Sequence, residues 1–198
     1  MKAADELPIR VHFGAPRSGK SHELKRRLAA DRPARLVIYD PRNEYGAFGR
    51  SIDRLSTAAA RSNDRAFSIV FRPSADRSIA VRQFSALCDI AFERGHLSFL
   101  ADELWTVMSP TFAPPGWRRV TREGGHQHLR IYCASQRPTE IDNGLFSLAT
   151  VIRTTRLNAK GDRVKLADAL DVDPAELQEL GPRGWIERDM LTGRVTRG

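Results

Sequence analysis

The sequence predicts an α/β protein with three layers, in which helices cover both faces of a mainly parallel central sheet. Short apolar segments that are typical of buried strands alternate with longer segments whose apolar residues recur at helical spacing. The first strand and the first helix are joined by residues 14–21, which match the pattern G-x-x-x-x-G-K-[ST]. This alternation favours parallel strands with right-handed crossovers and a phosphate site at the carboxyl ends of the strands.

The first half of the chain contains three expected strands and three expected helices. The second strand ends before Pro41 and the third ends at Pro73, where proline removes a backbone donor. The third helix has apolar residues at helical spacing and ends at Gly95. In chain order, we expect strand 9–13, helix 22–30, strand 34–40, polar loop 42–50, helix 51–60, strand 66–73 and helix 78–94.

The second half continues the alternation and ends in a hairpin. A proline-rich loop precedes a short helix, and the last helix begins at Asp173-Pro174, a typical cap followed by proline. The expected elements are strand 97–103, helix 117–123, strand 129–138, strand 151–157, helices 162–170 and 173–180, and a hairpin from 184–189 and 193–195. No linker, repeat or low-complexity tract interrupts them, so we expect a single domain over residues 1–198.

Composition indicates a soluble globular protein with an anionic partner. The chain has 41% hydrophobic and 28% charged residues, a formal net charge of +8 and a pI near 10.2. An excess of positive charge favours binding to an anionic polymer such as nucleic acid. Cys88 and Cys133 lie in apolar segments without metal-ligand spacing, as in a reduced intracellular protein. The sequence has neither a signal peptide nor a membrane-spanning run, and we expect a cytoplasmic location.

The glycine-rich pattern predicts a nucleotide site. Gly14 and Gly19 allow tight turns and close approach of the backbone to a phosphate, and amides at the start of the helix attract the anion. In this pattern Lys20 reaches the β- and γ-phosphates, and the hydroxyl of Ser21 binds Mg²⁺. We therefore expect ATP and Mg²⁺ to bind here, the nucleotide at Gly14, Ala15, Pro16, Arg17, Ser18, Gly19, Lys20, Ser21 and His22.

A second motif, which is acidic, completes the prediction of an ATPase. Residues 97–103 form an apolar strand that ends in Asp102 and Glu103, the Walker B arrangement when it follows a phosphate-binding loop. Asp102 is expected beside Mg²⁺, together with Ser21. Glu103 is expected to orient and deprotonate the water that attacks the γ-phosphate. Gln136 ends a later strand, where its side chain is expected to contact the γ-phosphate.

The order of these motifs resembles the FtsK–HerA superfamily of ring-forming ATPases that pump DNA. The resemblance rests on the phosphate-binding loop, Leu-Ala-Asp-Glu-Leu-Trp at 100–105, Arg-Glu-Gly at 122–124 and Ala-Ser-Gln-Arg-Pro-Thr-Glu-Ile at 134–141. The compact chain is most similar to the genome-packaging ATPases of icosahedral viruses with an internal membrane. This resemblance implies an ATP-driven, sequence-independent translocase of double-stranded DNA, in a hexameric or pentameric ring. It further implies portal or capsid vertex proteins as possible partners, and a place in the host cytoplasm or the virion.

The resemblance also implies catalytic residues beyond the two motifs. Gln136 is expected to couple the γ-phosphate to movement, and an arginine finger is expected from a neighbouring subunit. Arg122 is the first candidate, before Arg119 and Arg118. One departure is that Gly125, rather than arginine, precedes His126. Loop arginines are candidates for contact with the DNA backbone: Arg42, Arg50 and Arg137.

Three alternatives share the phosphate-binding loop. A cellular or plasmid DNA-pumping ATPase of the same superfamily would carry the same motifs. A small-substrate kinase would lack the combination of an Asp-Glu motif with Gln-Arg-Pro at a later strand end. This chain has both, the second as Gln136-Arg137-Pro138. Filamentous-phage assembly ATPases resemble membrane-anchored proteins, whereas this sequence has no apolar run of about 18 residues. DNA-stimulated turnover of ATP distinguishes a motor from a kinase.

Overall fold

The computed structural model describes residues 8–198, which form one twisted nine-stranded sheet with helices on both faces. The strand order is β3-β4-β2-β5-β6-β1-β7-β8-β9, and all pairs from β3 to β7 are parallel. The strands are β1 (Ile9–Phe13), β2 (Arg35–Tyr39), β3 (Arg50–Ile52), β4 (Phe67–Phe71), β5 (Ser98–Ala101), β6 (Arg130–Ser135), β7 (Val151–Thr155), β8 (Trp185–Asp189) and β9 (Val195–Arg197). The predicted mainly parallel α/β class is therefore confirmed.

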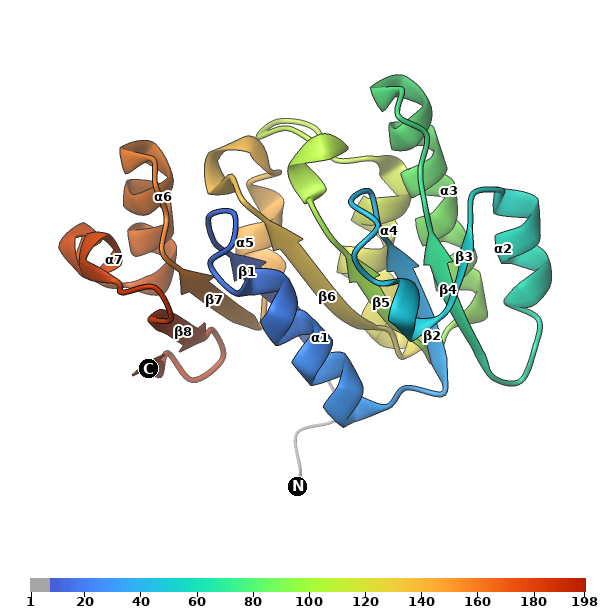
Figure 1. Ribbon diagram of the computed structural model, residues 1–198, viewed down its shortest axis with the longest axis horizontal. Coiled ribbons are helices and arrows are strands. Elements are labelled where there is room, and N and C mark those ends of the chain that lie inside the picture. The colour runs from blue at the N-terminus through green and yellow to red at the C-terminus, as the bar shows by residue number, and fades with distance from the viewer. Residues whose placement is uncertain (1–7) are drawn as a thin grey trace.

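Helices flank the sheet in the expected three layers (Figure 1). They are α1 (Lys20–Asp31), α2 (Leu55–Arg61), α3 (Arg77–Arg94), α4 (Pro115–Glu123), α5 (Gly144–Leu148), α6 (Lys160–Leu170) and α7 (Pro174–Glu179). Helix α1 crosses one face beside β1 and β6, whereas α3 and α4 pack against each other on the opposite face. Helices α6 and α7 lie at the end of the sheet formed by β7 and β8.

Two apolar cores separate the layers because successive strand residues point to opposite faces. On β2, Leu36 and Ile38 pack with Leu24 and Leu28 of α1. The alternate residues of the same strands belong to a larger core with α3 and α4. The centre of that core is an aromatic group in which the ring centroid of Trp117 lies 5.5 Å from that of Phe84 and 6.3 Å from that of Phe99. Strands buried on both faces hold the central sheet, and with it the loops at its carboxyl edge, in place.

The structure corrects one expected element and adds one that was not expected. Residues 51–60 were expected to form one helix, but Arg50–Ile52 form β3 and α2 begins only at Leu55. The backbone of β3 pairs with β4, so sheet pairing at the edge overrides the helical preference of the local sequence. Helix α5 is an additional element that the sequence did not predict, with only five residues. The predicted hairpin is present as β8 and β9, which are antiparallel to each other, and β8 pairs antiparallel with β7.

The phosphate-binding loop, the acidic motif and Gln136 all lie at the carboxyl edge of the parallel strands. The loop follows β1, Asp102 and Glu103 follow β5, and Gln136 directly follows β6, and these three strands are consecutive in the sheet. Within residues 8–198, no helix combines the length and the apolar composition required to cross a bilayer.

Candidate active site

The loop between β1 and α1 is fastened to β7 as well as to its own helix. The amide of Ala15 donates to the carbonyl oxygen of Arg156 over 2.9 Å, and Thr155 Oγ1 donates to Ser18 Oγ over 2.6 Å. A Cβ atom at position 14 would lie 2.1 Å from Thr155 Oγ1, so this position requires glycine. Gly19 has φ of 94°, a conformation that glycine adopts without strain. The loop therefore has a fixed shape at the amino terminus of α1, where backbone amides attract phosphate.

Lys20 and the two acidic residues form a buried ionic cluster. Lys20 Nζ lies 3.1 Å from Asp102 Oδ1 and 3.4 Å from Glu103 Oε1. These three residues are only 5%, 1% and 3% exposed, respectively. Buried charges are stable when they are paired, and each charge here has an opposite partner. The structure thus brings together the lysine of the loop and the acidic pair, which are 82 residues apart in sequence.

A buried tyrosine completes the surroundings of Asp102. Tyr45 donates its hydroxyl hydrogen to Asp102 Oδ2 over 3.0 Å, and its own amide donates to Asp40 Oδ2 over 2.9 Å. Burial raises the pKa of Tyr45, and the negative charge of Asp102 raises it further. The phenol therefore stays protonated and acts as a donor to Asp102. Asp40 also accepts from the amide of Glu44, which fixes the loop after β2 next to the site.

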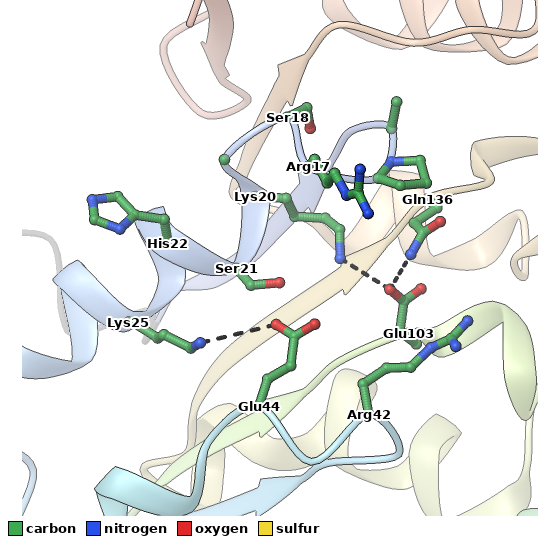
Figure 2. A pocket seen from close by; sticks show the side chains of 13 residues that line it. Arg17, Ser18, Lys20, Ser21, His22, Lys25, Arg42, Glu44, Glu103 and Gln136 are labelled. Atoms are coloured by element: carbon green, nitrogen blue, oxygen red, sulfur yellow. Dashed lines mark hydrogen bonds and ion pairs between the residues drawn. The ribbon is translucent and has the colours of Figure 1, made fainter. Parts of the chain in front are cut away.

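Glu103 has a different partner on each carboxylate oxygen. Oε1 accepts from Lys20 and from the side-chain amide of Gln136, which point toward it in Figure 2. Oε2 accepts from the indole N–H of Trp105 over 2.6 Å. The backbone of Glu103 is left-handed, with φ 52° and ψ 48°, a strained conformation for a residue with a side chain. Strain of this kind persists where the surroundings hold a side chain in place.

A cavity of about 680 Å³ lies over this cluster. Arg17 projects over it from the loop, Lys25 forms a 3.9 Å ion pair with Glu44 at its rim, and Arg42 lies beneath Glu103 (Figure 2). Its lining contains most of the predicted nucleotide-binding residues: Ala15, Pro16, Arg17, Ser18, Gly19, Lys20, Ser21 and His22, with Lys25, Arg42, Glu44, Glu103 and Gln136. Gly14 lies behind it, buried against Thr155. A basic cavity at the start of a helix suits a polyphosphate.

The oxygen donors beside the cavity fit a magnesium ion. The Ser21 hydroxyl lines the cavity, and the Asp102 carboxylate lies under it. Mg²⁺ takes oxygen ligands and is commonly held by one or two protein groups plus substrate phosphates and waters. Residues 8–198 contain no cluster of three or more His, Cys, Asp or Glu side chains that would form an all-protein cage. The donor set therefore fits an ion that arrives with a nucleotide.

The arginines predicted as trans fingers lie elsewhere in the chain. Arg122 lines a separate cavity with Ile9 and Leu129, near the amino ends of β1 and β6 and thus at the opposite edge of the sheet. Arg119 stacks over Phe92, with 4.0 Å between the guanidinium carbon and the ring centroid. Arg118 is exposed on α4. None of the three lines the Lys20 cavity of its own chain, so a role in hydrolysis would require a second subunit.

Sequence reasoning missed Tyr45 and Trp105. Tyr45 lies in the segment expected to be a polar loop, 57 residues before Asp102, and nothing in the local pattern indicated burial. Trp105 was noticed only as part of the motif at 100–105. An aromatic residue with a polar N–H, two positions after a predicted catalytic acid, was the available signal.

A buried histidine lies behind the loop on β1. His12 is 2% exposed, it is paired in register with Arg153 of β7, and its Nε2 has no hydrogen-bond partner among residues 8–198. Burial, together with the positive charges of Arg27 and Arg153, lowers the pKa of His12 to about 3. The imidazole is therefore neutral near pH 7.

The chain is similar to one phage protein, and its fold is similar to those of several solved structures. The chain is 25% identical over 174 residues to Protein P9 of Pseudoalteromonas phage PM2, which covers 84% of this chain and 77% of that protein. The genome packaging NTPase B204 of Sulfolobus turreted icosahedral virus 2, in complex with AMPPCP, superposes with a TM-score of 0.75 at 16% identity, over 96% of both chains. VirB4 of Thermoanaerobacter pseudethanolicus superposes with a TM-score of 0.73 at 12% identity, over 100% of this chain and 90% of that one. No protein-family model matches the chain.

These similarities confirm the predicted resemblance at the level of the fold. The chain shares its overall fold with a genome packaging NTPase of an icosahedral virus. The same architecture is shared with VirB4.

Proposed function

We propose that this chain hydrolyses ATP to drive double-stranded DNA through a homo-oligomeric ring, as a genome-packaging motor does. The observation that carries the proposal is the buried cluster of Lys20, Asp102 and Glu103 under the basic cavity. A phosphate-binding lysine, a carboxylate for the metal and a second carboxylate for water are the parts that ATP hydrolysis requires. The similarity to an ATPase described as DNA-packaging supports DNA as the substrate that is moved.

Each group has a defined part in the proposed reaction. The loop amides and Lys20 bind the β- and γ-phosphates, for which Lys20 exchanges its carboxylate partners. Glu103 accepts a proton from the water whose oxygen attacks the γ-phosphorus, and ADP leaves with the bridging oxygen. Mg²⁺, held by Ser21 and Asp102, would neutralise charge on the phosphates. Gln136 contacts Glu103 and thereby connects the γ-phosphate to the loop after β6.

The proposed ring would complete each site across a subunit interface. An arginine that meets the charge developing on the phosphoryl group is worth about 10³–10⁵ in rate in other nucleotide hydrolases. Arg122 remains the first candidate because it is exposed and does not line the Lys20 cavity of its own chain. Mixing Arg122→Ala subunits with Lys20→Ala subunits tests this directly. Recovered activity supports a finger in trans, whereas inactivity at every ratio eliminates Arg122.

The proposed grip on DNA is electrostatic and independent of sequence. The net charge of +8, repeated around a ring, attracts a polyanion, and contacts with phosphates carry no sequence information. Arg42 and Arg50 are exposed candidates for this contact. Arg137 is less available because Asp162 and Glu140 both pair with it. Affinity should fall with salt, with a log–log slope of about −0.9 per phosphate neutralised.

The experiment that tests the function measures ATP turnover with and without double-stranded DNA, alongside the mass of the assembly. The proposal predicts DNA-stimulated hydrolysis by a ring, and Glu103→Gln should retain ATP binding while turnover falls about 10²–10⁴-fold. If the rate of ATP hydrolysis does not change at any concentration of DNA, the result would contradict a motor and favour a small-substrate kinase. A cellular or plasmid DNA-pumping ATPase is the alternative within the fold, and the match to VirB4 of Thermoanaerobacter pseudethanolicus supports it in that a non-viral protein has the same fold.

The location and the assembly partners are also part of the proposal. A packaging motor would act in the host cytoplasm or at the virion. Docking onto portal or capsid vertex proteins stays a prediction from the sequence resemblance.

A further inference from the structure

Trp105 folds back onto the residue expected to activate water. The chain turns at Glu103 with a left-handed backbone and continues as a single tight turn, Leu104–Thr106. Both the amide and the hydroxyl of Thr106 donate to the carbonyl oxygen of Glu103, over 2.9 Å and 2.8 Å. This doubly fastened turn directs the indole toward the carboxylate two residues earlier.

The indole N–H of Trp105 donates to the oxygen of the Glu103 carboxylate that does not face the phosphate-binding loop. Trp105 Nε1 donates to Glu103 Oε2 over 2.6 Å, while Oε1 accepts from Lys20 and Gln136 on the cavity side. A hydrogen bond to an ionised acceptor is short and about twice as strong as a neutral one. One oxygen of the carboxylate is therefore anchored, and the other remains directed at the nucleotide cavity.

The turn that carries Trp105 is itself held by a residue outside the nucleotide cavity. The guanidinium of Arg77 donates to the carbonyl oxygens of Thr106 and Met108, each over 3.2 Å. On its other side the indole lines a second cavity of about 420 Å³, together with Tyr39 and Arg42. Trp105 is half-buried and packs against the large core, and this packing does not by itself require the contact that its N–H makes.

From this geometry we infer that Trp105 positions Glu103 for hydrolysis by anchoring Oε2, so that Oε1 faces the attacking water. The inference rests on the proposed ATPase activity. Trp105 is a positioning residue because it acts on the water only through Glu103. Without the N–H, the carboxylate is free to rotate away from the water, and misplacement by a short distance costs a large factor in rate. ATP binding does not need this contact, because the phosphates bind the loop and Lys20.

The test compares Trp105→Phe, which keeps an aromatic ring without the N–H, with Trp185→Phe as a matched control. Trp185 lies on β8, where it stacks on Arg153, and it does not line the cavity. Losing a charge-assisted hydrogen bond should lower kcat by about tenfold to a hundredfold. The Kd for ATP should change by less than about twofold, and both variants should show clear thermal transitions. An unchanged kcat in Trp105→Phe would overturn the inference.

A double-mutant cycle separates positioning from a general effect on folding. If Trp105 acts through Glu103, adding Trp105→Phe to Glu103→Gln should not lower single-turnover hydrolysis further. If Trp105→Phe lowers the rate of hydrolysis by the same factor in the Glu103→Gln protein as in the wild type, Trp105 has a structural role and the inference is overturned. A wild-type protein that binds ATP but never hydrolyses it would instead refute the proposed function. Calorimetry of ATP binding by every variant distinguishes failure of the inference about Trp105 from failure of the proposed function.

Discussion

Asp162 offers the sharpest test of how the loop after β6 is held next to the active site. It is 2% exposed on α6, and its carboxylate accepts three hydrogen bonds from that loop. Oδ1 accepts from the amide and the hydroxyl of Thr139, over 3.1 Å and 2.7 Å. Oδ2 accepts from Arg137 Nε over 3.2 Å. Asp162→Ala removes all three contacts, whereas Asp162→Asn can retain both contacts with Thr139.

The two substitutions should differ measurably in the free energy of unfolding. The ion pair to Arg137 is worth about 0–1 kcal/mol, because the arginine side chain is 49% exposed and solvent screens the charge. Each bond to half-buried Thr139 contributes about 1 kcal/mol net. Asp162→Ala should therefore cost about 2–3 kcal/mol, and Asp162→Asn about 1 kcal/mol or less. For a chain of this size, 1 kcal/mol corresponds to about 2–4 °C, so Asp162→Ala should lower Tm by about 5–10 °C.

Thermal unfolding followed by circular dichroism measures these shifts, and chemical denaturation measures the free energies. Asp168→Ala is the matched control, because this aspartate is exposed on the same helix and should change stability by less than about 0.5 kcal/mol. Equal melting temperatures for the alanine and asparagine variants at position 162 would refute the reasoning, since the contacts with Thr139 would then contribute nothing.

Three further predictions concern the site and the strand behind it. Gln136→Ala should bind ATP nearly normally but lose DNA stimulation of the ATPase; loss of nucleotide binding would make Gln136 structural. Tyr45→Phe removes the donor to Asp102 and should weaken Mg²⁺-dependent ATP binding by about tenfold, with binding in EDTA unchanged, as calorimetry can check. His12 has a folded pKa near 3 against 6.5 unfolded, so protonation of the unfolded chain removes stability as pH falls from 6.5 toward 3. His12→Gln should therefore reduce the slope of unfolding free energy between pH 6 and 4.5, by up to about 1.4 kcal/mol per pH unit; an unchanged slope would contradict the assignment.

The sequence was sufficient for the elements whose apolar pattern is long or whose motif is specific. The central strands are apolar on both faces, and the loop at 14–21 has a pattern that few other structures produce. The alternation of strands and helices predicted a phosphate site at the carboxyl ends of the strands. In the structure, Lys20 lies 3.1 Å from Asp102 and 3.4 Å from Glu103 at that edge.

What the sequence did not predict depends on contacts between distant segments. Strand β3 has three residues and exists because β4 offers free backbone groups beside it. Tyr45 is buried only because Asp40 folds the loop inward by accepting two backbone amides. Neither effect leaves a periodic signal in the local sequence.

The strand order has a consequence for the order of events during synthesis on the ribosome. Strand β1, which precedes the phosphate-binding loop, pairs only with β6 and β7, and the loop is fastened by Thr155 and Arg156. Strand β1 is synthesised first, but it can pair only after β6 and β7 have been made, and these lie more than 100 residues later in the chain. At about 5–20 residues per second, this delay lasts about 7–28 seconds. A nascent chain arrested between residues 136 and 151 has both Walker motifs yet lacks strand β7, which shapes the loop, and it should not retain ATP.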